Sequence, residues 1–158
     1  MLCNFGDCEN AESYEIAPNA WLLDLEDIEK DSGRLIQRKR KCEVKSFSTK
    51  HRFIAGQVLY SKLRPYLNKV IIADEDGYCT SEILPLDFDK AVYNRFAQVY
   101  LMSPFFVGYA IQFSYGVKMP RLGTQDGRMA LVPLPSLAEQ KRIVTSIDAL
   151  LPLCDRLN

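Results

Sequence analysis

Three runs of four or five mainly apolar residues in the first half of the chain predict short β-strands. They are residues 21–25, 57–60 and 69–73. Residues 34–52 show little periodicity and are expected to form loops with one strand edge. Gly56 and the Asp31-Ser32-Gly33 sequence are turn signals. The first half is therefore expected to be rich in β-structure.

Two local sequences predict how the backbone runs near these strands. Residues 74–77, Asp-Glu-Asp-Gly, predict a hairpin turn, so that residues 78–80 would begin a strand returning along residues 69–73. Arg64 precedes Pro65 and is expected to be extended, because the proline ring disfavours a helical conformation at the residue before it.

The periodicity becomes helical in the second half. The residues on one helical face are Val92, Phe96, Val99 and Tyr100. Ser103 supplies an N-cap and Pro104 suits the first helical position, which predicts a second helix over residues 104–113. Residues 130–135 contain two prolines and are expected to be extended.

The last segment predicts the clearest helix of the chain. Ser136 and Glu139 have the spacing of a capping box, in which each side chain accepts a hydrogen bond from the other's backbone. Apolar residues then recur at a 4-3-4-3 spacing: Ile143, Ile147, Leu150, Cys154 and Leu157. This seam predicts pairing with a partner helix. The alternative is an amphipathic helix packed on its own domain. Pro152 is expected to kink the helix or end it near Leu151.

A chain of 158 residues with 47% apolar and 25% charged residues suits one compact domain. The expected class is α+β: a mixed or antiparallel, β-rich domain with a few helices over residues 1–135, then the start of a coiled-coil-type helix over 136–158. No apolar run approaches the roughly 20 residues of a membrane helix, and the first residues lack a signal-peptide pattern. The five cysteines include no C-x-x-C pair and fit reduced thiols. A cytoplasmic protein is expected.

The formal net charge is zero, but the charges are distributed unevenly along the chain. Residues 1–33 hold nine acidic residues and one basic residue, whereas residues 34–69 hold eleven basic residues and one acidic residue. Aromatic residues interleave with these cations, as they do in nucleic-acid grooves: Phe47, Phe53, Tyr60 and Tyr66. This composition favours a polyanion-binding surface. The alternative is that the cations pair with the acidic N-terminal third, in exposed ion pairs that contribute little.

The motifs of common enzyme classes are absent from the sequence. It contains neither G-x-x-x-x-G-K-[ST] nor G-x-G-x-x-G, and neither H-E-x-x-H nor G-x-S-x-G. The one histidine, His51, cannot supply a two-histidine metal site. The Asn/Asp-Pro-Pro-aromatic loop of an adenine methyltransferase is missing as well. We therefore expect a chain that is not an enzyme and that holds no metal and no cofactor.

Four segments occur in an order and with a content that point to one family. They are residues 56–69 (GQVLYSKLRPYLNK), 79–84 (CTSEIL), 116–122 (GVKMPRL) and 132–144 (VPLPSLAEQKRIV). Together they resemble the DNA specificity (S) subunit of type I restriction–modification systems, over about residues 20–157. The last segment is the most specific, because it joins a proline-rich entry to the Glu-Gln-Lys-Arg start of a helix.

The resemblance implies a subunit with two target recognition domains, each followed by a long helix, and the two helices pair as an antiparallel coiled coil. Each domain would read one half of a split DNA sequence. Two methyltransferase subunits would dock on the helices, bind S-adenosylmethionine and methylate adenine, and a restriction subunit can join them. The S subunit itself has no catalytic activity, so S-adenosylmethionine is expected on the partner and not on this chain.

This chain departs from that pattern, because it holds one recognition domain, has a short helix and does not match over its first 20 residues. Three interpretations remain open. It is a fragment, a half-subunit that forms a homodimer through its helix, or a degenerate copy that acts only as an assembly protein for methyltransferase subunits. A homodimer would read a two-fold symmetric site.

Cationic side chains on loops are the candidates for DNA contact, because they neutralise phosphates and read base edges. The candidates are Arg38, Arg40, Lys45, Lys50, Arg52, Lys62, Lys118 and Arg121. For each of them the alternative is an ordinary exposed charge. Arg64 is instead expected to hold the extended segment. If about five phosphates are neutralised, log K should fall with log salt at a slope of about −4.5.

Overall fold

The structure, a computed structural model, describes residues 2–45 and 48–155. The described part contains a five-stranded sheet, a three-stranded sheet, a two-stranded hairpin and four α-helices. The predicted α+β class is confirmed. No helix in these residues has the length and apolarity needed to span a lipid bilayer.

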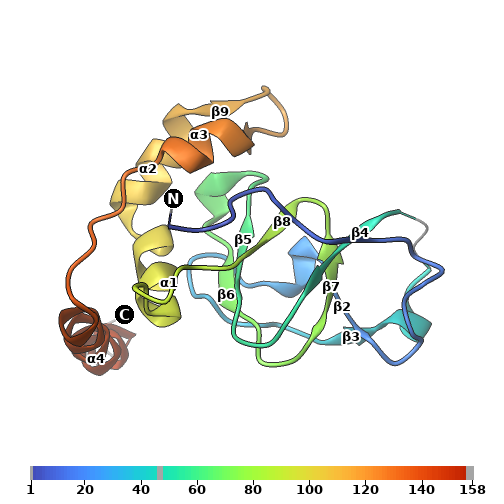
Figure 1. The fold of residues 1–158 in the computed structure, drawn as a ribbon, viewed down its shortest axis with the longest axis horizontal. Helices are drawn as coiled ribbons and strands as arrows, with labels where there is room; N and C mark the ends of the chain where they lie inside the picture. Colours follow the sequence, from blue (N-terminus) through green and yellow to red (C-terminus); the bar gives the residue numbers. More distant parts are fainter. Residues whose placement is uncertain (1, 46–47, 156–158) are drawn as a thin grey trace.

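The five-stranded sheet occupies the side of the molecule away from the helices (Figure 1). Its strands, in spatial order, are β1 (Asn10–Ala11), β4 (Lys50–Phe53), β7 (Gly77–Thr80), β2 (Trp21–Leu23) and β3 (Lys39–Arg40). All neighbours are antiparallel except β2 and β7. Trp21 and Phe53 pack edge to face with ring centroids 5.1 Å apart. A side chain at Gly77 would meet the Phe53 ring at 2.7 Å, so the close packing of β7 requires glycine there.

The three-stranded sheet lies between two apolar cores. Its antiparallel strands, in spatial order, are β6 (Val70–Ile72), β5 (Val58–Ser61) and β8 (Ile83–Leu86). Successive residues of a strand point to opposite faces. Val58 and Tyr60 accordingly enter the core shared with the helices, whereas Leu59 enters the core beneath the five-stranded sheet. All residues of β5 are buried for this reason.

The helices cover the other side of the three-stranded sheet (Figure 1). They are α1 (Asn94–Met102), α2 (Pro104–Gln112), α3 (Thr124–Met129) and α4 (Leu137–Asp155). α1 packs against β5, β6, α2 and α4. The Ser103 hydroxyl accepts a hydrogen bond from the backbone N–H of Phe106, which confirms the predicted N-cap of α2. The short helix α3 was not predicted. Three 3-10 turns complete the chain: η1 (Leu25–Asp27), η2 (Lys41–Glu43) and η3 (Pro65–Leu67).

The prediction of a hairpin at residues 74–77 is wrong. The chain does turn there, but β6 pairs with β5, whereas β7 pairs with β2 and β4 in the other sheet. The carboxylate of Asp76 accepts a hydrogen bond from the backbone N–H of Ala55, which ties this turn to the connection between β4 and β5. β7 thus forms one parallel and one antiparallel ladder in the five-stranded sheet.

The prediction for Arg64 is also wrong, and so is one of the two outcomes predicted for Pro152, an end of the helix near Leu151. Arg64 is left-handed (φ 49°, ψ 62°) and not extended, because its N–H donates to the carbonyl of Pro120 while the chain turns into η3. α4 does not end near Leu151 but continues through Pro152 to Asp155. The φ that the proline ring requires is close to helical, so the helix loses one hydrogen bond there without having to stop.

Only half of the predicted capping box forms at the start of α4. The Ser136 hydroxyl accepts a hydrogen bond from the backbone N–H of Glu139 at 3.3 Å. The carboxylate of Glu139 instead receives the guanidinium of Arg142, and the hydrogen bond from Arg142 lowers the pKa of Glu139. Arg142, three positions further along the helix, therefore binds the Glu139 carboxylate in place of the backbone N–H of Ser136.

The carboxylate of Asp27 is the most buried acidic group in the described part. Its removal is expected to lower the free energy of unfolding. It accepts hydrogen bonds from the Asp24 backbone and the Gln37 amide, both at 2.8 Å, and pairs with the ammonium of Lys39 at 2.9 Å. Replacing Asp27 with alanine removes the buried carboxylate that these three groups share, and we expect a loss of about 3 kcal/mol in the free energy of unfolding, measured by urea denaturation.

The matched control is Glu26→Ala, because Glu26 pairs with the same lysine while its side chain is 71% exposed. Its removal should change the free energy of unfolding by less than about 1 kcal/mol. If both variants lost equally little, Asp27 would not stabilise this corner of the fold.

Candidate nucleic-acid interface

Two of the predicted DNA-contacting residues, Arg38 and Arg40, form ion pairs with carboxylates of this chain. The guanidinium of Arg38 lies 4.2 Å from the centroid of the Trp21 ring and binds Asp74 at 2.6 Å. Both arginines also bind Glu75, and the hydrogen bond from Arg40 lowers the pKa of that carboxyl group. These guanidinium groups reach DNA only by giving up carboxylate partners.

Three more candidates lie on or beside β4. Arg52 pairs with Glu9 at 3.1 Å. Lys50 is buried, its ammonium donates to the hydroxyl of Ser48 at 2.7 Å, and burial lowers its pKa. The structure therefore places Lys50 inside the fold and not on a DNA-facing surface. Lys45 is exposed on the connection between η2 and β4. Phe47, one of the interleaved aromatic residues, lies outside the described residues.

Part of the basic segment pairs with the acidic N-terminal third, as one of the two alternatives predicted. Arg34 pairs with Glu29, Lys39 with Glu26 and Asp27, and Arg52 with Glu9. Lys69 donates to the carbonyl of Leu25 at 2.7 Å. Arg38 and Arg40 pair with Asp74 and Glu75 instead, so ion pairs neutralise part of the uneven charge along the sequence.

The remaining candidates gather around the hairpin of β9 (Ser114–Tyr115) and β10 (Arg121–Leu122). The N–H of Leu122 donates to the carbonyl of Lys62 at 3.0 Å, and the N–H of Arg64 donates to the carbonyl of Pro120 at 2.7 Å. The N–H of Lys62 donates to the carbonyl of Glu82 at 3.0 Å. Backbone bonds therefore join three segments that are far apart in sequence and carry Lys62, Arg64, Lys118 and Arg121.

Arg121 fastens this hairpin to the sheet. Its Nη2 and Nε bind the carboxylate of Glu82 at 2.7 and 2.9 Å, and its Nη1 donates to the carbonyl of Met119 at 3.1 Å. The hydrogen bonds that Arg121 donates to Glu82 raise the pKa of Arg121. With its donors used in this way, Arg121 positions the hairpin and is a poor candidate for direct base contact.

Lys62 and Lys118 differ from the arginines in having no carboxylate partner among residues 2–45 and 48–155. Lys62 is partly exposed and Lys118 is exposed. Arg64 forms no ion pair in the same part of the chain, and its buried Nε has no hydrogen-bond partner there. We call the side chains of Lys62, Arg64, Tyr115, Lys118 and Arg121 the hairpin surface.

The backbone is strained on one side of the hairpin surface. Arg64 and Asn68, at the two ends of η3, both have positive φ, which costs energy for residues with a side chain. The Asn68 amide donates to the carbonyl of Met102 at 3.1 Å, while its buried carbonyl oxygen has no partner in the described part. Arg64 was expected to hold the extended segment, and Glu82 and Tyr115 were not predicted at this site, because their proximity depends on long-range pairing.

A second surface lies on α4, at the lower left of the view, whereas the hairpin lies at the top (Figure 1). One face of the helix is fastened to its own domain. The buried amide of Gln140 accepts from the backbone of Tyr93 at 2.8 Å and donates to the carbonyls of Ala91 and Pro135, both at 2.9 Å. Val144 is buried one turn later, and Asp148 pairs with Arg95.

The adjacent face of α4 carries the predicted seam. Ile143 and Ile147 are half-buried and Leu150 is 58% exposed. Only the backbone of Cys154 is described, and Leu157 lies outside the described residues. One face of α4 therefore packs on its own domain, as one alternative predicted, while pairing with a second helix through the neighbouring face stays a prediction. We call Ile143, Ile147 and Leu150 the helix stripe.

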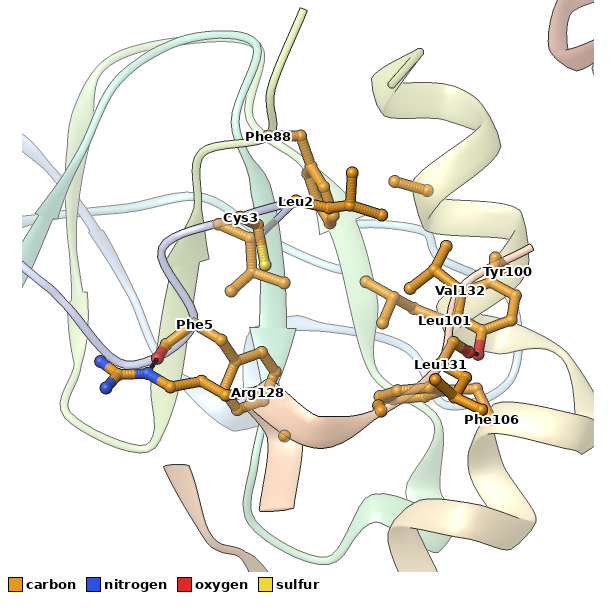
Figure 2. Close-up of a pocket in the computed structure, with 14 residues that line it drawn as sticks. Leu2, Cys3, Phe5, Phe88, Tyr100, Leu101, Phe106, Arg128, Leu131 and Val132 are labelled. Carbon is orange, nitrogen blue, oxygen red and sulfur yellow. Dashed lines mark hydrogen bonds between the residues drawn. The ribbon is translucent and has the colours of Figure 1, made fainter. Parts of the chain in front are cut away.

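An apolar pocket of about 300 Å³ lies between the N-terminal segment, α1 and residues 127–132 (Figure 2). Its polar groups are engaged, since the Nε of Arg128 donates to the carbonyl of Phe5 and the Tyr100 hydroxyl donates to the carbonyl of Leu131. Burial raises the pKa of the Cys3 thiol, which makes it a weaker nucleophile. Within the described residues no group of three His, Cys, Asp or Glu side chains could hold a metal ion.

Comparison with known proteins gave a curated relative and several similar solved structures. No protein-family model matches the sequence. The EcoDI specificity subunit of a type I restriction enzyme from Escherichia coli is 31% identical over 140 residues, which are 89% of this chain and 31% of that protein. The HsdS subunit from Thermoanaerobacter tengcongensis superposes with a TM-score of 0.79 at 19% identity, covering 97% of this chain and 42% of that one.

A further chain comes from a structure concerned with complex assembly and conformational transition of the type I R-M system. It superposes with a TM-score of 0.74 at 19% identity, covering 94% of this chain and 43% of that one. The chain therefore spans less than half the length of each of these proteins.

Proposed function

We propose that this chain, which is related over most of its length to part of a type I restriction specificity subunit, is a module that recognises double-stranded DNA and has no catalytic activity of its own. The observation that carries this proposal is the hairpin surface. It places Lys62 and Lys118, two lysines without carboxylate partners in the described part, on segments held together by backbone hydrogen bonds. Cations on a rigid scaffold position a protein on the DNA backbone.

The proposed partners follow from the same relationship. The helix stripe on α4 would pair with a second specificity-type helix, supplied by another copy of this chain, or would dock a methyltransferase subunit. S-adenosylmethionine would bind to that methyltransferase, and a restriction subunit would join the same assembly. A cytoplasmic location agrees with this function.

The proposal is tested by selection of duplexes from a random-sequence pool with the 158-residue chain, alone and together with a type I methyltransferase subunit. We expect one short sequence to be enriched in at least one of the two conditions. Selection that enriches nothing in either condition would contradict DNA recognition.

An assembly role without DNA recognition is the second candidate, and the exposed part of the helix stripe favours it. In that case the chain would bind methyltransferase subunits through α4 and leave the hairpin surface unused. Charge reversal on the hairpin surface distinguishes the two functions, because only DNA recognition predicts that it matters.

A further inference from the structure

We propose that Val117, at the tip of the β9–β10 hairpin, contacts the C5-methyl group of a thymine in the DNA major groove. The hairpin would then be the element that reads sequence. This inference rests on the proposed function and adds to it the reading element and the kind of base that it recognises.

The tip of the hairpin exposes apolar side chains to an unusual degree. Val117 is 99% exposed, Tyr115 at the base is 62% exposed, and Met119 on the returning arm is 43% exposed. Residue 116 is glycine, with φ +94°, and a side chain there would meet the carbonyl oxygen of Met119 at 3.2 Å. The turn therefore holds Val117 away from the body of the domain.

The hairpin that carries these exposed side chains is held in place by contacts with the rest of the domain. The ion pair between Arg121 and Glu82 holds one arm to the end of the three-stranded sheet. The hydrogen bond from Arg64 to Pro120 and the isolated bridge between Leu63 and Arg121 hold it to the segment after β5. A contact side chain on a rigid support reads a partner more accurately than one on a mobile loop. Val117 meets this condition although it packs against nothing.

Charge complementarity identifies nucleic acid as the occupant of this surface. Lys118 follows Val117 directly, and Lys62 and Arg64 lie on the segment that pairs with the base of the hairpin. An apolar tip flanked by cations matches a groove whose floor presents base edges and whose rims carry phosphates. A surface that docked an apolar protein would not need these unpaired lysines.

The shape and chemistry of the tip favour the major groove. That groove admits a two-stranded β-ribbon, and its one apolar base group is the thymine methyl. The minor groove presents no methyl group, and side chains that wedge between base steps there are usually larger than valine. A β-branched aliphatic side chain at the tip of a ribbon therefore fits a methyl contact best.

The test uses the duplex that the chain selects from a random pool, with each thymine in turn replaced by uracil, which removes only the methyl group. For the wild-type chain we expect one replacement to weaken binding about fourfold, the effect of one buried methyl-sized group. Val117→Ser should weaken binding to the thymine duplex by a similar factor and should bind the thymine and uracil duplexes equally. Val117 makes no packing contact, so the variant should fold.

Leu131→Ser is the matched control, because Leu131 is 83% exposed on the segment that leads to α4. It should retain both the affinity and the uracil sensitivity of the wild-type chain. If no thymine is sensitive to uracil, or if Val117→Ser retains the wild-type sensitivity, the methyl contact is overturned while DNA recognition stands. If no duplex is selected, the proposed function fails and this inference fails with it.

Discussion

Replacing Lys62 and Lys118 together with glutamate is expected to weaken binding to duplex DNA about fiftyfold near 0.1 M salt. Each lysine that neutralises a phosphate releases about 0.9 of a counterion. Lys62, Arg64 and Lys118 are the cations of the hairpin surface without a carboxylate partner in the described part, which predicts a slope of log K against log salt of about −2.7 for the wild-type chain. With one such cation left, the slope should fall to about −0.9.

The measurement is fluorescence anisotropy of a labelled duplex over a series of salt concentrations. The control is Lys30→Glu with Lys90→Glu, which changes the net charge equally at two exposed lysines outside the hairpin surface. We expect the control to weaken binding by less than about threefold. Equal losses in the two double variants would show that net charge, and not the hairpin surface, governs binding.

The second large effect is expected on α4. Replacing Ile147 and Leu150 with aspartate places two carboxylates on the helix stripe, where they would be buried upon pairing with a second helix. We expect self-association, or binding to a methyltransferase subunit, to weaken more than about a hundredfold, because two apolar contacts are lost and two charges must be desolvated. The domain itself should fold, since Gln140 and Val144 fasten the other face.

Light scattering over a wide concentration range measures this effect directly. The control is Thr145→Asp with Ala149→Asp, at exposed positions on the far side of the helix. A dimer that only the stripe variant disrupts would identify a half-subunit that pairs through its helix. A complex with itself or with a methyltransferase subunit that survives Ile147→Asp and Leu150→Asp would show that the stripe is not the contact.

The elements that local patterns specify were predicted from the sequence. The short apolar runs became β2, β5 and β6, and the Ser103-Pro104 pair marked the start of α2. The pairing of these elements was not predictable in the same way. The turn at residues 74–77 indicates where the chain bends, but β7 pairs with β2 and β4, which lie far from it in sequence.

The sequence indicated that the candidate site consists of cationic side chains, but it indicated only in part which of them are free to contact DNA. Eight cations were named, and the long-range ion pairs that neutralise several of them could not be read from spacing. Arg38 meets Asp74 from 36 positions away and Arg121 meets Glu82 from 39 positions away. These pairs lower the number of free phosphate contacts, so the expected salt slope falls from about −4.5 to about −2.7.

The most direct test of DNA recognition is the ratio of two dissociation constants. One is measured for the duplex that the chain selects, and the other for a scrambled duplex of the same composition, at one salt concentration. Recognition predicts that the selected duplex binds at least about a hundredfold more tightly, and that this ratio survives a change of salt while both affinities fall. A ratio near one, with or without a methyltransferase subunit, would contradict it.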